Sequence, residues 1–167
     1  MKFDILQHIG VCTDDRRFKN RPKDYNLELN IVSWNGKGPQ YDLREWSLDH
    51  QRCFQGLSLT REEMDRMLQG YLRFERIDYG FEEICDDSAI LIDKNGLLIR
   101  IAKLIAVLAP SENGYTKMLT ITSWNRNRLK YDIRSWSADY SRMTKGMSLN
   151  DVEMRNFMSV YKTWISL

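Results

Sequence analysis

The amino-acid sequence predicts an α+β fold in which four strands followed by one helix occur twice. Three observations lead to this prediction. Tyr25–Tyr71 aligns without a gap with Tyr115–Tyr161, and nineteen of the forty-seven aligned pairs are identical. Apolar and polar residues alternate along much of each copy, as in strands with one buried face. Each copy ends in a helix-capping pattern followed by an apolar stripe at helical spacing.

The first unit is expected over residues 1–73. Strands are predicted at Phe3–Val11, Tyr25–Asn35, Tyr41–Ser47 and Gly56–Leu59. Asn35-Gly36 is a typical hairpin turn, because both residues tolerate positive φ angles. Thr60 and Glu63 form a capping-box pattern, so a helix should begin directly after the fourth strand.

The second unit is expected over residues 97–167 and repeats this order. Its first strand, near Ile99–Val107, corresponds to the first strand of the chain, and Asn150 with Glu153 forms its helix cap. Residues 74–96 are interpreted as a linker. A hairpin around Asp93–Gly96 would add an extra strand that the first unit lacks.

Composition restricts the function classes. The chain has 167 residues, of which 43% are hydrophobic, so it should form a packed core. Its net charge of only +2 indicates that it has no polybasic tail. Three separated cysteines and two histidines give no metal-type spacing, so we expect no metal site, no cofactor and no catalytic residues. The first ten residues do not resemble a signal peptide, and no apolar run is long enough to span a membrane. We therefore expect a cytoplasmic protein, associated with the nucleoid if it is bacterial.

Strand alternation defines a candidate binding face. Leu29 and Ile31 share one face with Leu43, which should be core, whereas Trp46 lies on the opposite face beside Arg44. The second copy repeats this arrangement. Large indoles on the face opposite the aliphatic residues indicate that something covers them.

The motifs on this face resemble those of the positive-cofactor-four family of single-stranded-DNA-binding transcriptional coactivators. The segment Tyr131–Trp136 (YDIRSW), followed by Lys145–Leu149 (KGMSL) and a capped helix, carries the resemblance. The first copy has the same motifs at Tyr41–Trp46 and Gln55–Leu59. The Ser-Trp-Asn hairpin is most similar to small bacterial YdbC-like members.

This resemblance implies a curved antiparallel sheet backed by a helix, with two such units pairing through helices and sheet edges. Because this chain carries both units, it implies an intramolecular pseudo-dimer, with further self-association left open. It also implies binding of single-stranded DNA with little sequence preference, in transcription, replication or repair. The family's lysine- and serine-rich extension has no counterpart here.

Unpaired bases stack on aromatic rings, and phosphates attract lysine and arginine. Asp42 and Asp132 would repel phosphate unless each pairs with a neighbouring arginine. We therefore predict a nucleic-acid-binding face of tryptophans and cations. Its residues are Trp34, Lys37, Arg44, Trp46, Arg100, Trp124, Arg126, Arg128, Lys130, Arg134 and Trp136.

Other interpretations remain open from the sequence. The same face could bind RNA, because stacking does not read the sugar, or it could be covered by a partner protein. Trp34 and Trp124 could equally be packing residues, because tryptophans bury large areas in small domains. A nuclease would have to use Asp42, Asp49, Asp132 and Asp139, but one acid per strand beside an arginine forms a poor metal cage. We therefore expect a protein without enzymatic activity.

Overall fold

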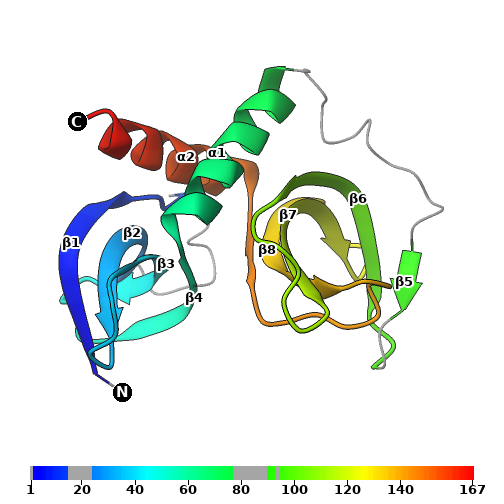
Figure 1. The fold of residues 1–167 in the computed structure, drawn as a ribbon, viewed down its shortest axis with the longest axis horizontal. Helices are drawn as coiled ribbons and strands as arrows, with labels where there is room; N and C mark the ends of the chain where they lie inside the picture. Colours follow the sequence, from blue (N-terminus) through cyan, green and yellow to red (C-terminus); the bar gives the residue numbers. More distant parts are fainter. Residues whose placement is uncertain (1, 15–23, 77–89, 93–94) are drawn as a thin grey trace. The chain divides into compact units, whose positions relative to one another are not determined.

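The computed structural model describes residues 2–14, 24–76, 90–92 and 95–167 (Figure 1). Four strands and a helix are followed by five strands and a second helix, which confirms the predicted α+β class. The elements are β1 (Phe3–Val11), β2 (Tyr25–Trp34), β3 (Gln40–Ser47), β4 (Cys53–Leu59), α1 (Arg61–Arg76), β5 (Ile90–Ile92), β6 (Leu98–Val107), β7 (Tyr115–Trp124), β8 (Lys130–Ser137), β9 (Met147–Leu149) and α2 (Asp151–Ile165). Neither helix in the described ranges combines the length and apolar character needed to cross a bilayer.

The strands form two antiparallel sheets in sequential order. The first sheet has the order β1-β2-β3-β4, and the second has the order β5-β6-β7-β8-β9. The extra strand β5 pairs with β6, where Leu91 lies opposite Ile99, so the predicted additional strand is present. Of the linker expected over 74–96, α1 takes up residues 74–76, and most of the remainder lies outside the described residues.

Both sheets are strongly curved, and the curvature has a local cause (Figure 1). The pairing of β1 with β2 shifts register between Ile5 and Gln7 and again after His8. The pairing of β6 with β7 shifts at the two corresponding places. An extra residue on one strand bends it and increases its twist, so these matched bulges bend the first strand of each repeat over its sheet.

The compact units of the chain differ from its sequence repeats. One unit consists of residues 1–61 with 151–167, and the other of residues 62–150. Each helix therefore belongs with the sheet of the other repeat: α2 with the first sheet and α1 with the second. The expected units 1–73 and 97–167 describe the order of elements, but they do not describe which helix packs on which sheet.

Contacts within each unit establish this exchange of helices. In the first unit, α2 contacts β1 and β2, and Asn156 Nδ2 donates to the carbonyl oxygen of Thr13 at 3.2 Å. In the second unit, Arg66 Nη1 on α1 donates to the carbonyl oxygen of Leu108 at 3.3 Å. Lys117 Nζ on β7 lies 3.0 Å from Glu63 Oε2 on α1.

The helix-facing core of each unit contains the aliphatic residues that alternation placed there. In the first unit, Tyr41 on β3 meets Tyr161 on α2 edge to face, with ring centroids 5.4 Å apart. In the second unit, Tyr131 contacts both Tyr71 and Phe74 of α1. The buried apolar residues of the first unit include Leu27, Leu29, Leu43, Leu59, Met154, Phe157, Met158 and Tyr161.

Candidate nucleic-acid interface

A buried aspartate on the third strand of each repeat holds the arginine two residues away. Arg44 Nε donates to Asp42 Oδ1 at 2.7 Å, and its Nη2 donates to Oδ2 at 2.9 Å. Arg134 makes the same two bonds to Asp132, at 2.6 and 2.9 Å. Such bidentate, charge-assisted pairs fix the plane of the guanidinium. The expectation that each aspartate pairs with its neighbouring arginine is confirmed.

Both aspartates are fully buried. Burial raises the pKa of the Asp132 carboxyl, while the hydrogen bond and charge of Arg134 and a hydrogen bond from Ser148 lower it. Ser58 makes the corresponding bond to Asp42 Oδ2 at 3.2 Å. The arginine charge is therefore largely compensated within the protein, which reduces its value for a phosphate contact.

The arginine lies over the first of two nearly parallel indoles. Arg44 Cζ is 4.4 Å from the ring centroid of Trp34, and the rings of Trp34 and Trp46 lie 6.2 Å apart at 17°. We call this set the Arg–Trp–Trp stack. The second repeat forms the same stack from Arg134, Trp124 and Trp136, with 4.4 Å and 5.9 Å for the corresponding distances. The first indole is also held at its nitrogen, because Trp34 Nε1 donates to Asp42 Oδ2 at 3.1 Å.

Trp46 and Trp136 are buried, with 0% and 1% of their surface exposed. Alternation placed them correctly, opposite the helix-facing core, but the expectation that they form exposed platforms is wrong. The curved sheet closes over them: Phe3 on β1 meets Trp46 at 4.9 Å, and Trp136 forms a cluster with Ile99 and Met118. They are therefore the buried members of the two stacks.

Trp34 and Trp124 are half-buried, and each directly precedes a hairpin turn. The turn residues Asn35 and Gly36 have φ angles of 52° and 73°, and Asn125 and Arg126 have 53° and 64°. Two successive positive φ angles are typical of a type I′ turn. In each turn the serine before the tryptophan bonds a carbonyl four residues on, at 2.5 Å. The indole is thus fixed relative to the turn.

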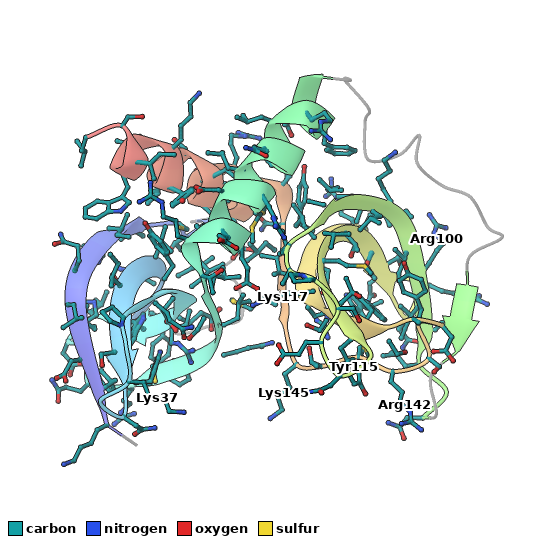
Figure 2. All side chains as sticks on the ribbon, viewed as in Figure 1. Lys37, Arg100, Tyr115, Lys117, Arg142 and Lys145 are labelled. Carbon is teal, nitrogen blue, oxygen red and sulfur yellow. The ribbon has the colours of Figure 1, made fainter. Side chains whose placement is uncertain are left out.

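The predicted cations differ in accessibility. Lys37, Arg126 and Arg128 are exposed at the turns, and Lys130 is half-buried at the start of β8. Arg100 is also half-buried, because β5 pairs beside it and makes β6 an interior strand. Figure 2 shows Lys37 on the first unit and Arg100 on the second.

The structure adds exposed residues that sequence reasoning missed. Phe54 is 40% exposed on β4, and its ring meets that of Tyr25 edge to face at 4.3 Å. The predicted fourth strand began at Gly56 and left Phe54 in a loop, whereas β4 begins three residues earlier, at Cys53. Arg142 and Lys145 are exposed between β8 and β9 of the second unit (Figure 2). The presence of Phe54 where the second copy has Thr144 is a sequence signal that could have identified the aromatic pair.

The acids of the nuclease alternative all have local partners. Asp42 and Asp132 are held by arginines, as described above. Asp49 and Asp139 each accept hydrogen bonds in the turn after the third strand, from Ser47 and Ser137 at 2.7 and 2.9 Å.

One group of metal-ligating side chains forms outside the predicted interface. Among the described residues, His8, Glu28 and His50 bring one ligand atom each to within 4.8 Å of the others. Their separation in the sequence gave no metal-type spacing. The bulged first strand and the turn after β3 bring them together.

Comparison with known proteins gives a relative but no named function. No family model matches the chain. An uncharacterized protein of Treponema pallidum is 47% identical over 64 residues, an alignment that covers 33% of this chain and 75% of that protein. The chain belongs to the same family as this Treponema pallidum protein.

Proposed function

We propose that this chain binds single-stranded DNA with little sequence preference. The single observation that carries the proposal is a half-buried indole, fixed by its stacking partners and directly followed by an exposed basic turn, in both repeats. Aromatic faces contribute about 1–3 kcal/mol per stacked base and do not depend on base identity. The exposed cations supply the attraction for phosphate.

In this proposal Trp34 and Trp124 replace the buried tryptophans as the base-contacting residues. Each is positioned before binding, because the buried indole and the paired arginine hold its ring. A base would contact the part of the ring that these two neighbours leave exposed, and a prepositioned ring loses little conformational entropy on contact. The aromatic pair of Tyr25 and Phe54 extends the accessible aromatic surface of the first unit.

The two repeats contribute unequally. The first turn carries Lys37, whereas the second carries Arg126 and Arg128 and is followed by Lys130. Arg142 and Lys145 add exposed charge to the second unit. We therefore propose that the second unit supplies most of the salt-dependent affinity.

The sequence resemblance to positive-cofactor-four proteins supports the same activity. Those proteins bind single strands with doubled curved sheets, and the duplicated motifs here lie on two such sheets within one chain. A role in transcription, replication or repair follows as part of the proposal.

The first test is a titration of the full chain with oligo-dT at several salt concentrations, in which tryptophan fluorescence reports binding. We expect quenching, and an affinity that falls with a log–log slope of about −0.7 per neutralised phosphate. The double variant R126N/R128Q should bind more weakly and show a shallower slope. The matched control R155Q/K162Q removes two exposed charges from α2 and should leave binding unchanged.

The competing outcomes are distinct. Tighter binding to a matched RNA oligomer would assign the face to RNA. Affinity that is insensitive both to salt and to R126N/R128Q would reject the electrostatic half of the proposal. Absence of binding to either oligomer, by a folded chain, would reject nucleic-acid binding and favour a partner protein.

A further inference from the structure

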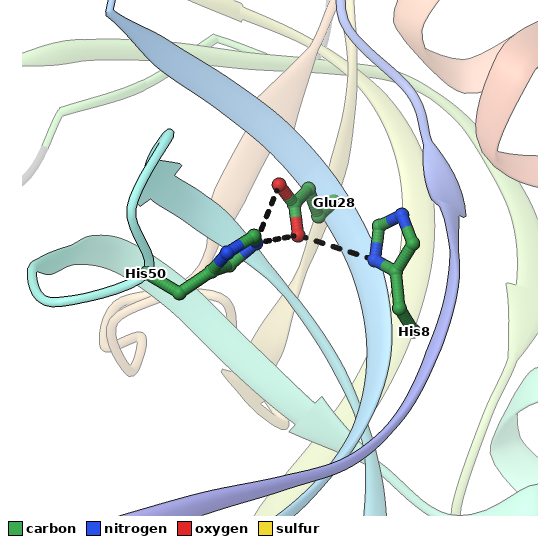
Figure 3. Close-up of side chains that lie close together, drawn as sticks. All are labelled: His8, Glu28 and His50. Atoms are coloured by element: carbon green, nitrogen blue, oxygen red, sulfur yellow. Dashed lines mark hydrogen bonds and ion pairs between the residues drawn. The ribbon is translucent and has the colours of Figure 1, made fainter.

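His8, Glu28 and His50 meet on the first sheet (Figure 3), where the ring of His50 lies 6.0 Å from that of Trp46. His8 lies on β1, Glu28 on β2, and His50 in the turn after β3. His50 Nε2 is 2.9 Å from Glu28 Oε1 and 3.1 Å from Oε2, and His8 Nδ1 is 3.4 Å from Oε1. We propose that these three side chains bind a divalent transition-metal ion, for which Zn²⁺ is the best match.

The ligand set and its spacing fit zinc. Two imidazoles and one carboxylate form a known zinc set that leaves a coordination position open. With metal–ligand bonds of about 2.0–2.2 Å, neighbouring ligand atoms of a tetrahedral site stand roughly 3.3–3.5 Å apart. The separations of 2.9 and 3.4 Å from Glu28 Oε1 are close to this, and all three ligand atoms lie within 4.8 Å of one another, so movement of side chains alone can complete the site.

The electrostatics of Glu28 also point to a cation. Its residue surface is 2% exposed, and a buried carboxylate is costly unless a positive charge or several hydrogen bonds compensate it. Within the described part of the chain, no lysine or arginine forms an ion pair with Glu28. Its partners are the two imidazoles and Asn30 Nδ2, which donates at 3.2 Å. A metal ion between these ligands would supply the missing charge.

The site is accessible and has a supporting residue. The side chains of His8 and His50 are 51% and 39% exposed, so an ion can enter from solvent. Asn30 is fully buried, and its Oδ1 lies 2.7 Å from His8 Nδ1. Without metal, this oxygen accepts the Nδ1 proton and orients the ring. Metal binding at Nδ1 requires the other neutral tautomer of His8, in which Nε2 carries the proton, and the amide oxygen then lies beside the ion.

The second repeat serves as an internal control. Leu104, Met118 and Tyr140 occupy the corresponding positions, and Tyr140 Oη lies 4.0 Å from Met118 Sδ. The backbone is conserved between the copies, with φ angles of 58° at His50 and 59° at Tyr140. The same framework therefore folds with neither a histidine nor a carboxylate at any of the three positions. The histidines and the glutamate are not needed to build the sheet.

The proposal is tested by zinc titration of the full chain in competition with a chromogenic chelator. The background carries C53S and C85S, so that neither of these cysteines can bind zinc through a thiolate. We expect one zinc ion per chain, and a loss of affinity of at least about tenfold in H8L and in H50Y. Both variants carry the residue that the second repeat places there. The control Y140H adds a histidine where Leu104 and Met118 cannot ligate, and should leave affinity unchanged.

Thermal unfolding and NMR provide a second readout, which separates loss of zinc binding from loss of the fold. In the starting protein, zinc should raise the thermal unfolding temperature and shift the imidazole ¹⁵N resonances of both histidines. The isosteric variant E28Q should lose both effects. Equal zinc affinity in the starting protein, H8L and H50Y would overturn the proposal. Imidazole resonances that respond to pH but not to zinc would also overturn it, and would make the group a protonation site instead. Neither outcome bears on oligo-dT binding, so the two proposals fail separately.

Discussion

Arg134 and Asp132 are joined by two hydrogen bonds, 2.6 Å from Nε to Oδ1 and 2.9 Å from Nη2 to Oδ2. The aspartate is fully buried, and the arginine side chain is 13% exposed. The pair therefore fixes the guanidinium that lies against Trp124. Asp42 and Arg44 repeat this relationship in the first unit.

Breaking this pair from one side should be costly. Asp132→Asn leaves the guanidinium of Arg134 largely buried without its counter-ion, and we expect a loss of roughly 3 kcal/mol in the free energy of unfolding. Urea unfolding followed by circular dichroism measures this. A loss below about 1 kcal/mol, as for an exposed ion pair, would contradict the structural role assigned to the pair.

Removing a buried indole should mainly lower the free energy of unfolding, because the ring is part of the core and not of an exposed binding surface. Trp136→Ala empties space beside Ile99 and Met118, and should cost about 3–5 kcal/mol. Thermal or urea unfolding provides the measurement. A variant as stable as the starting protein would show that Trp136 is more exposed than the structure places it.

Gly56 and Gly146 allow the fourth strand to approach the paired arginine. A Cβ at Gly56 would meet the carbonyl oxygen of Leu43 and the Cβ of Arg44, and one at Gly146 would meet the corresponding backbone. Gly56→Ala should therefore lower the free energy of unfolding by about 2 kcal/mol or more. Gly38→Ala is the matched control, because nothing lies within 4 Å of its added Cβ. Similar losses in both variants would show that the close approach is unimportant.

The hairpin turns differ in strain at one position. Arg126 has a φ of 64°, where the first repeat has Gly36 at 73°. A left-handed conformation costs a non-glycine residue about 1–2 kcal/mol, and glycine gives back part of this in chain entropy. Arg126→Gly should therefore raise the free energy of unfolding by up to about 1 kcal/mol, while weakening oligo-dT binding.

The reciprocal substitution Gly36→Arg gives the control for this prediction. It should destabilise the first unit by a similar amount, because it introduces the strain that Arg126→Gly removes. A chemical denaturation series on both variants measures the two changes. Changes of the same sign in the two variants would be inconsistent with turn strain.

Acid should weaken the turn that Asp139 closes. Hydrogen bonds from the Ser141 side chain and backbone, and from Ser137, lower the pKa of Asp139 from 3.8 to about 2. Because the folded-state pKa is lowered, this stabilisation is present above 3.8 and is lost as the pH falls towards 2. Asp139→Asn should therefore lose less stability than the starting protein over this range.

Asp49 occupies the corresponding turn, and hydrogen bonds from Ser47 and Gln51 lower its pKa as well. The double variant D49N/D139N should flatten the acid dependence further. Unfolding midpoints measured across the same pH range provide the comparison. An unchanged slope in the double variant would mean that other carboxylates govern the acid response.

The alternation of residues was sufficient to locate most strands and to assign the two faces of each sheet. Leu29 and Leu43 are buried in the core, and Trp46 lies opposite them, as predicted. The pairing of Asp42 with Arg44 was also predictable, because residues two apart on a strand share a face. These features depend on neighbours within the chain or across one turn, where spacing determines geometry.

Which helix covers which sheet was decided only in three dimensions. The apolar stripes of α1 and α2 are so alike that either would fit either sheet. The alternation of residues also could not predict how exposed the tryptophans are. It assigns each residue to a face of the sheet, but it does not show how far the sheet bends over that face. The bulges of β1 and β6 supply that bend and bury Trp46 and Trp136.

The sequence by itself determined the duplication, the two α+β units and the local partners of each strand residue. Only the tertiary structure brought His8 and His50 to Glu28, and placed each helix on the sheet of the other repeat. The physical reason is range: side-chain periodicity reports the surroundings of one strand or helix. Curvature and long-range packing depend on residues far apart in the chain. For such residues, the separation in sequence does not determine the distance in space.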